Sequence, residues 1–332
     1  MGGETIVKLL MVSFLATAAF AGAAIADVKI SGYGRTGLVY YEDDGRLPEG
    51  ANTTEISSRL RMDIKASTKT DNDLEFGAQF RMQWDQGDAG VESISPGMVS
   101  VGYGGLIVYV GNVVPAFDGA PLLKQTRLGV FERSWGGDPI GRFFLSADKG
   151  YGRDEDRVGV ALRYTRDNFL IRASYVDPDQ SGMNESAVGY SEELSFAVNY
   201  KWEDYLEVTA ATAQNGAGFK DSDLYFVGAR YTISDVARVG MNFIDNGKQL
   251  HSRQGTVGSP GNTVVIYGDY DIGDVTLSGY LANNNGDWER KKTDNSFGIG
   301  ANYDLGGAVL GASLQRDYDE RLYADMGVRF DF

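Results

Sequence analysis

The sequence predicts an all-β fold, a transmembrane antiparallel β-barrel of 16 strands. Three observations predict it: apolar and polar residues alternate along many short segments, short turns alternate with long loops, and glycine is abundant. The chain has 332 residues with 44 glycines, 12% aromatic residues and only 7 prolines. That composition suits strands and turns, whereas each glycine inside a helix would cost about 0.5–1 kcal/mol.

The charge and the rare residue types exclude several classes of function. The formal net charge is −15, so nucleic acid is not an expected partner, because phosphate binding needs a surplus of Lys and Arg. Cysteine is absent, which excludes disulfides, thiolate metal sites and a cysteine nucleophile. His251 is the single histidine, and this makes a histidine-rich metal site improbable. No cofactor is expected.

The N-terminal segment 1–26 predicts a secretory signal peptide. Lys8 precedes an apolar run from Leu9 to Phe20, and Ala24-Ile25-Ala26 fits an A-x-A cleavage site that leaves Asp27 as the mature start. The alternative is a membrane anchor, but the run is shorter than the ~20 residues that a spanning helix needs. Residues 27–332 are then expected to form the barrel.

Two-residue alternation recurs along the rest of the chain. In residues 56–68 and 74–84 one face consists mainly of apolar side chains at every second position, with Ser58 as a polar member, and a polar turn at 70–73 joins the two segments, which predicts an antiparallel hairpin. Six more hairpins follow the same pattern, at 99–110, 158–176, 194–213, 225–243, 264–281 and 297–314. With a first strand at 28–41 and a last at 322–332, the expected number of strands is 16.

The connections divide into two kinds. Short turns join the strands within each hairpin, and longer loops join successive hairpins, at 43–55, 86–97, 112–156, 177–191, 214–223, 245–262, 283–295 and 316–321. Short turns at one end and long loops at the other are typical of transmembrane barrels. Sixteen apolar faces need an extensive apolar partner, and lipid supplies it if the sheet closes. Aromatic residues at strand ends fit the interfacial girdles of such barrels, although aromatics also favour strands in general.

A barrel of 16 strands is too wide for its own side chains to fill and leaves an aqueous channel. The alternation places a polar face toward this lumen. The expected lumen residues include Arg35, Arg59, Arg61, Lys65, Glu75 and Arg81. The pattern therefore predicts passage of water and small hydrophilic solutes.

Three stretches resemble the general diffusion porins of the Gram-negative outer membrane, especially the Rhodobacter-type porins of alphaproteobacteria. They are Asp27–Gly34, the segment from Ser57 to Phe80 and the end, Asp325–Phe332. The C-terminal Phe332, after alternating apolar residues, is similar to the signal that the outer-membrane assembly machinery reads. The resemblance implies an outer-membrane homotrimer in contact with lipid and lipopolysaccharide.

The resemblance also implies that the third loop folds into each lumen and constricts it. The corresponding loop here, 112–156, is far longer than ordinary loops. By position, the wall residues of the constriction are Arg35, Arg59, Arg61 and Arg81, and the candidate loop acids are Asp118, Glu132 and Asp138. The loop carries seven acidic and six basic residues, so the sign of ion selectivity stays open. Its aromatic and leucine residues either pack it against the wall or narrow the pore.

Parts of the sequence are compatible with other functions. Asp154, Glu155 and Asp156 could hold a structural Ca²⁺ ion, or could be solvated loop charge. A substrate-selective channel for sugars or anions could use the same barrel. An outer-membrane barrel enzyme would have to use His251 or carboxylates alone, and a soluble periplasmic β-protein would need another cover for its apolar faces. The sequence favours a channel without enzymatic activity.

Overall fold

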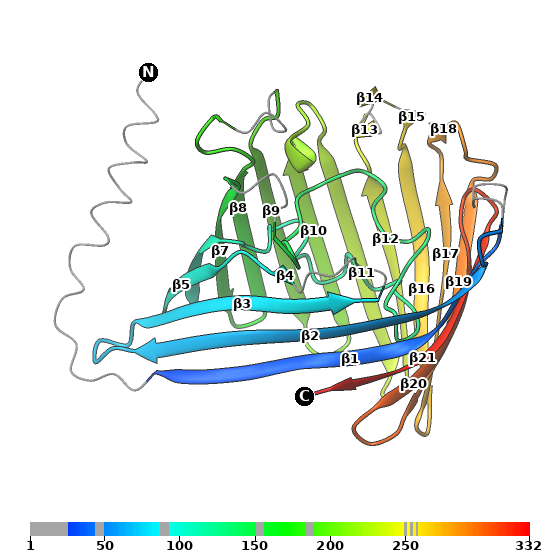
Figure 1. Ribbon diagram of the computed structural model, residues 1–332, viewed down its shortest axis with the longest axis horizontal. Helices are drawn as coiled ribbons and strands as arrows, with labels where there is room; N and C mark the ends of the chain where they lie inside the picture. The colour runs from blue at the N-terminus through cyan, green and yellow to red at the C-terminus, as the bar shows by residue number, and fades with distance from the viewer. Residues whose placement is uncertain are drawn as a thin grey trace.

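The computed structural model is a closed antiparallel barrel (Figure 1). It describes residues 26–43, 50–86, 93–150, 156–183, 189–248, 251–252, 255–256 and 258–332. Apart from Ala26, the expected signal peptide 1–26 lies outside the described residues. The first strand begins at Asp27, the residue expected to start the mature chain.

Within the described residues, 16 long strands form the wall, as predicted. They are β1 (Asp27–Tyr41), β2 (Thr54–Lys69), β3 (Glu75–Asp85), β5 (Met98–Tyr103), β6 (Leu106–Gly111), β7 (Val158–Arg166), β8 (Phe169–Asp177), β9 (Glu193–Trp202), β10 (Leu206–Gln214), β11 (Leu224–Ser234), β12 (Ala237–Asp245), β16 (Asn262–Ile272), β17 (Val275–Asn284), β19 (Asn295–Asp304), β20 (Val309–Arg316) and β21 (Leu322–Asp331). Each pairs with the next, and β1 pairs with both β2 and β21. This last pairing closes the sheet and leaves it without a free edge.

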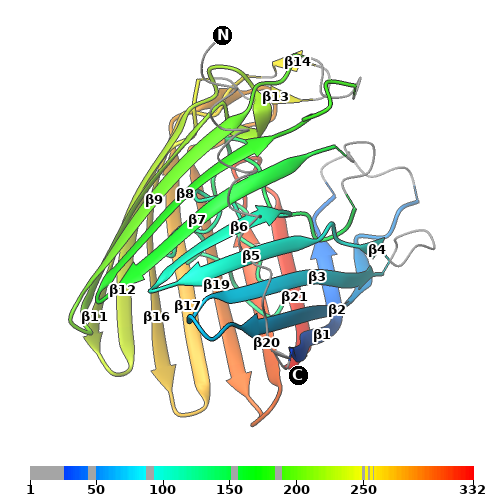
Figure 2. The ribbon, with the colours of Figure 1, turned by 90° about the vertical axis from the view of Figure 1, so that its left-hand side faces the viewer.

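The two ends of the barrel differ as expected, with short turns at one end and long loops at the other (Figure 2). The turn between β5 and β6 shows why glycine is frequent there. Gly104 and Gly105 have φ angles of 56° and 86°, and a Cβ atom on Gly105 would lie 2.4 Å from the carbonyl oxygen of Thr165. Only glycine adopts this conformation without strain and leaves that space free.

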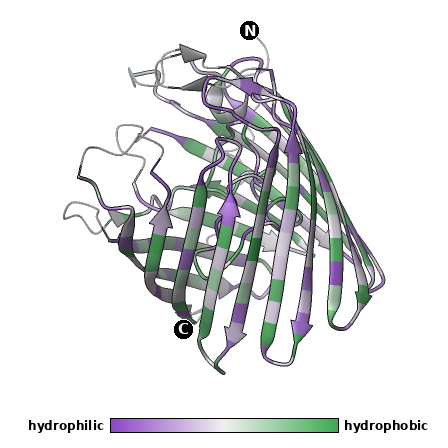
Figure 3. Ribbon diagram, turned by 90° about the vertical axis from the view of Figure 1, so that its right-hand side faces the viewer, coloured by the Kyte–Doolittle hydropathy of each residue, from purple (hydrophilic) through white to green (hydrophobic). Residues whose placement is uncertain are grey.

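The outer surface of the wall is apolar. Hydrophobic and hydrophilic residues alternate along the strands in Figure 3, and the apolar ones that point outward are exposed, among them Ile266, Leu281 and Ile299 at 53%, 67% and 59%. At the short-turn end, outward aromatic residues are also exposed, including Trp202, Tyr231, Tyr270 and Tyr303. An apolar band with aromatic residues at its border is the surface that lipid covers in transmembrane barrels.

The apolar core lies inside the barrel, between the wall and the third loop. The loop, between β6 and β7, runs through the interior in Figure 1. Its residues Phe117, Leu122 and Leu123 are fully buried against inward residues of β9 to β12, such as Phe226 and Ile244. Burying a large apolar side chain contributes about 1.5–3 kcal/mol, so these contacts hold the loop in the lumen.

The long loops contain short strands that the alternation did not predict. They are β4 (Ser93–Ile94), β13 (His251–Ser252), β14 (Gly255–Thr256), β15 (Gly258–Ser259) and β18 (Asp287–Trp288), with a 3₁₀ turn η2 at Gly216–Gly218. These segments are too short for a two-residue period to show. Among the described residues, no helix is long and apolar enough to cross a membrane.

Candidate functional site

The four wall arginines named from the sequence lie on the inner face of β1, β2 and β3. Arg35 is opposite Arg59 in the register of β1 and β2, and Asp63 is opposite Arg81 in that of β2 and β3. Arg61 lies two residues after Arg59 on β2, so the strand period puts both on one face. The structure therefore brings the predicted wall cluster together.

Asp148 is the loop carboxylate that meets this cluster. Nη2 of Arg61 donates to Oδ2 of Asp148 at 2.6 Å, and Nη1 of Arg81 donates to Oδ1. Nε of Arg81 also donates to Asp63 at 2.9 Å. The side chain of Asp148 keeps 40% of its surface exposed, so one carboxylate joins the loop to two strands while still facing the open lumen.

A second ion network lies beside the first. Nε of Arg59 donates to Oδ1 of Asp85 at the end of β3, and Nζ of Lys149 lies 3.0 Å from Oδ2 of the same carboxylate. Lys149 follows Asp148 directly in the loop. Adjacent loop residues of opposite charge thus meet wall residues of opposite charge, which sets the position of this loop segment.

Arg35 anchors the loop through its backbone. Only 9% of its surface is exposed, and Nη1 donates to the carbonyl oxygen of Phe131 at 2.8 Å. Its guanidinium carbon lies 5.2 Å from the centre of the Phe131 ring, within the range of a cation–π contact. Arg35 is thus less open to the lumen than Arg59, which has 25% of its side chain exposed.

The three loop acids named from the sequence have different partners. Glu132 reaches the wall, with Oε1 2.7 Å from Nη1 of Arg329 on β21. Asp118 and Asp138 instead pair with bases of the loop itself, Lys124 and Arg127. Burial raises the pKa of the Asp138 carboxyl, and the charge of Arg127 opposes that rise. Of the three, Glu132 is the one with an ion pair to a wall arginine among the described residues.

The hydrophobic residues of the loop pack it against the wall. The Trp135 ring stacks on Tyr323 of β21, with centroids 3.9 Å apart and an angle of 8° between the planes. Phe143 lies against Phe117 at 4.8 Å. Polar groups add to this docking, since Asn242 donates to the carbonyl of Leu122 at 2.9 Å. Of the two interpretations left open by the sequence, packing is the one these contacts support.

Sequence reasoning did not single out Asp148, Asp85 or Arg329. The spacing of Asp85 after Arg81 places both on one face of β3, a signal that the strand pattern contained. Asp148 lies near the end of the loop, where the chain returns to β7, and β7 is separated from β3 by β5 and β6, so its contact with Arg81 gave no signal in the sequence. The partners of the loop acids depend on the course of the loop, which has no periodic signal.

The residues proposed for a calcium ion lie mostly outside the described part of the chain. Asp154 and Glu155 are not described, and Asp156 accepts a hydrogen bond from Oγ of Ser181. Among the residues that the structure describes, no group of three His, Cys, Asp or Glu side chains is arranged to hold a metal ion. A calcium site at these residues stays a prediction.

The comparisons with known proteins agree with this architecture. Residues 13–322 match the family model described as Gram-negative porin. The chain is 36% identical to a porin of Fuscovulum blasticum and 26% identical to a porin of Rhodobacter capsulatus, in both cases over 92% of this chain and the whole relative. A solved variant of the Rhodopseudomonas blastica porin superimposes with a TM-score of 0.81 at 35% identity, covering 92% of this chain and all of that one.

The resemblance seen in the sequence is therefore confirmed. The closed barrel has an apolar exterior and a charged interior, and the porins that it resembles match over 92% of this chain. Such a barrel lies in the outer membrane and conducts small hydrophilic solutes and ions by passive diffusion. The chain belongs to the family of Gram-negative porins.

Proposed function

We propose that Asp148, Arg61 and Arg81 form the charged edge of the channel constriction. The observation that carries this proposal is the carboxylate of Asp148 shared between two guanidinium groups of the wall, at the open margin of the loop. The carboxylate and the two guanidinium groups in contact with it form a local dipole at the edge of the aqueous passage, whose field acts on solutes that pass close to it. Such a field orients water and dipolar solutes and disfavours apolar ones.

We propose in addition that the channel is only weakly ion-selective. The guanidinium groups of Arg59, Arg61 and Arg81 each have a carboxylate partner. Paired charges of opposite sign cancel over a few ångströms, and salt screens exposed charges beyond about 10 Å at 0.1 M. The net charge of −15 belongs to the whole chain and does not describe the constriction.

The test is the double variant Arg61→Gln/Arg81→Gln, measured in planar lipid bilayers. We expect the reversal potential in a KCl gradient to shift toward cation selectivity, because Asp148 and Asp63 lose their partners. Arg166→Gln is the matched control, since Arg166 lies at a short turn with 75% of its side chain exposed. An unchanged reversal potential in the double variant would refute the assignment.

We propose that the protein assembles as a homotrimer and that the assembly machinery recognises Phe332. The family resemblance supports the trimer. The Phe332 backbone exchanges two hydrogen bonds with Gly32, at 2.8 and 2.9 Å, while the residue remains 51% exposed. Light scattering in detergent would measure the oligomeric state. Deletion of Phe332 should lower the amount of folded protein in the outer membrane without changing its expression.

We propose that the protein has no hydrolytic activity. Its relatives are named as porins, and passive diffusion through a lumen needs no catalytic group. The side chain of His251 lies outside the described residues. An esterase assay on the purified wild-type protein and on His251→Ala tests the proposal, and hydrolysis that disappears in the variant would contradict it.

A further inference from the structure

A second pair of lumen arginines lies apart from the constriction, on β7 and β8. Arg163 and Arg172 are directly opposite each other in the register of these strands. Two like charges at opposed positions repel each other and destabilise a sheet unless something neutralises them. They lie three residues from the turn that joins β7 to β8, so the pair sits toward the short-turn end of the barrel.

Among the residues that the structure describes, no carboxylate pairs with Arg163 or Arg172. The Nε atoms of Arg163 and Arg172 are both buried and have no hydrogen-bond acceptor among the described residues. The charge of the loop residue Asp118 acts on Arg172, but the carboxylate of Asp118 already pairs with Lys124. Several other inward arginines of the wall have a carboxylate partner, for example Arg230, whose guanidinium lies 2.8 Å from the carboxylate of Glu207. Buried Nε–H donors without acceptors are costly, and this cost, together with the two adjacent positive charges, points to an anionic ligand.

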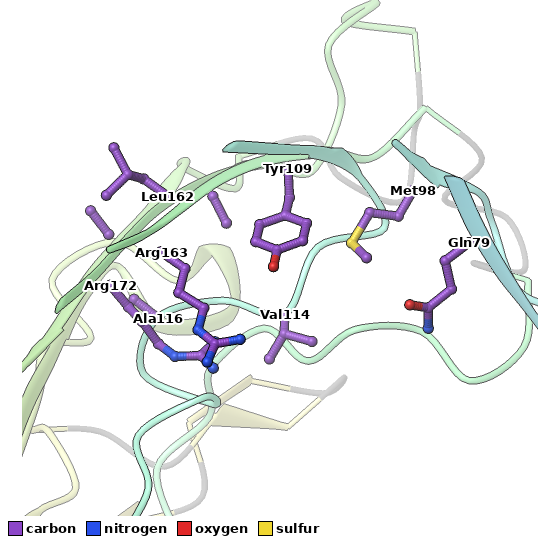
Figure 4. Close-up of a pocket in the computed structure, with 10 residues that line it drawn as sticks. Gln79, Met98, Tyr109, Val114, Ala116, Leu162, Arg163 and Arg172 are labelled. Atoms are coloured by element: carbon purple, nitrogen blue, oxygen red, sulfur yellow. The ribbon is translucent and has the colours of Figure 1, made fainter. Parts of the chain in front are cut away.

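The two side chains border a cavity of about 170 Å³. Figure 4 shows their guanidinium groups side by side, with Tyr109 and Val114 beside the same space and Met98 and Gln79 farther along it. Val114 and Ala116 belong to the third loop, so the loop forms one side of the cavity. The cavity thus has a cationic end with two guanidinium groups and a mainly apolar body.

The size and lining of the cavity restrict what can fill it. A cavity of about 150 Å³ holds a molecule of the size of benzene. Two neighbouring guanidinium groups favour a planar carboxylate, because Arg donates two parallel hydrogen bonds to it. Met98, Val114 and Ala116 offer apolar contact but no charge.

We propose that Arg163 and Arg172 form a binding site for small carboxylates with a compact apolar body. The bound carboxylate neutralises the two guanidinium groups, and the site thereby retains such a solute on its way through the channel. It is separate from the constriction proposed above, since it uses none of the residues Arg61, Arg81 or Asp148. Its failure in an experiment would leave that proposal intact.

Benzoate is the probe, applied to single channels of the purified protein in planar bilayers with KCl. We expect benzoate to reduce the single-channel current of the wild type, with an inhibition that saturates as the benzoate concentration rises. In Arg163→Gln/Arg172→Gln the half-inhibiting concentration should rise at least tenfold, which corresponds to about 1.4 kcal/mol. The control Arg166→Gln/Lys201→Gln removes two exposed positive charges near the short turns and should keep the wild-type value.

Two further probes separate the contributions of charge and shape. Benzyl alcohol has nearly the same shape without the charge, and inorganic phosphate has the charge without the apolar body. Either probe acting as strongly as benzoate would overturn the proposal, and so would equal inhibition of the wild type and the double variant. The current in KCl alone shows that a variant has folded and inserted. If the double variant does not insert, Arg163→Gln and Arg172→Gln are tested singly, and an unchanged benzoate response in both would refute the site.

Discussion

Asp148 offers the sharpest test of the constriction. In Asp148→Asn the loop loses one negative charge, while Arg81 keeps Asp63 at 2.9 Å and Arg61 keeps its hydrogen bond to Gln83 at 2.7 Å. The wall cluster therefore stays in place, but its positive charge is no longer balanced from the loop side. The expected result is a shift toward anion selectivity.

The size of the shift follows from the exposure of the site. An ion that passes about 7 Å from the carboxylate in water-like surroundings interacts with it by about 0.6 kcal/mol. Since about 7 Å is below the Debye length of about 10 Å at 0.1 M salt, screening reduces this to about 0.3 kcal/mol. Loss of the carboxylate charge disfavours cations and favours anions by about 0.3 kcal/mol each, which is about 0.6 kcal/mol between them. The ratio of cation to anion permeability should therefore fall about threefold.

The assay is the reversal potential of single channels across a KCl gradient. Asp167→Asn is the matched control, because Asp167 lies in an exposed turn and has a φ angle of 49°, which Asn also tolerates. Two results would refute the reasoning: no change in selectivity of Asp148→Asn at normal conductance, or an equal shift in the control. Measurement at 1 M KCl should reduce the effect, since the Debye length there is about 3 Å.

Three other predictions concern docking of the loop, pH and the lipid face. Leu122→Ala should lower the stability of the folded protein in detergent by about 2–5 kcal/mol, because Leu122 is fully buried, whereas Leu145→Ala in the same loop, at a residue that is 50% exposed, should have little effect. Burial raises the pKa of the Asp138 carboxyl. Its protonated form therefore stabilises the folded protein below the ordinary carboxyl pKa near 4, and this stabilisation should be lost as the pH rises through the raised pKa. Asp138→Asn should flatten this part of the dependence of melting temperature on pH, and an unchanged dependence would contradict the prediction. Ile299→Arg on the outer face should reduce folding into lipid vesicles by about 2–4 kcal/mol if the residue lies near the midplane, and an effect near zero would argue against lipid contact there.

The barrel itself could be predicted from the sequence because its signals are local. Alternation in segments such as 74–84 reports which side chains face lipid and which face water, since the strand period is two residues. The number of strands followed from counting such segments, and the structure has the same number among its described residues. The wall arginines were identified for the same reason, because each belongs to the inner face of a regular strand.

The partners of the loop could not be predicted in this way. Asp118 and Asp138 are loop acids like Asp148, yet they pair with Lys124 and Arg127, while Asp148 reaches the wall. The sequence also contains no sign that the Nε atoms of Arg163 and Arg172 have no acceptor among the described residues, because the strand pattern only places both arginines on the inner face.

The amino-acid sequence by itself determined the closed 16-stranded wall, its two faces and the positions of its charged residues. Only the tertiary structure decided which loop carboxylate meets Arg61 and Arg81, and which arginines have an Nε atom without an acceptor in the described part of the chain. The physical reason is that a strand presents its side chains at a fixed period, whereas an irregular segment of about 45 residues takes its course from contacts with strands distant in the chain.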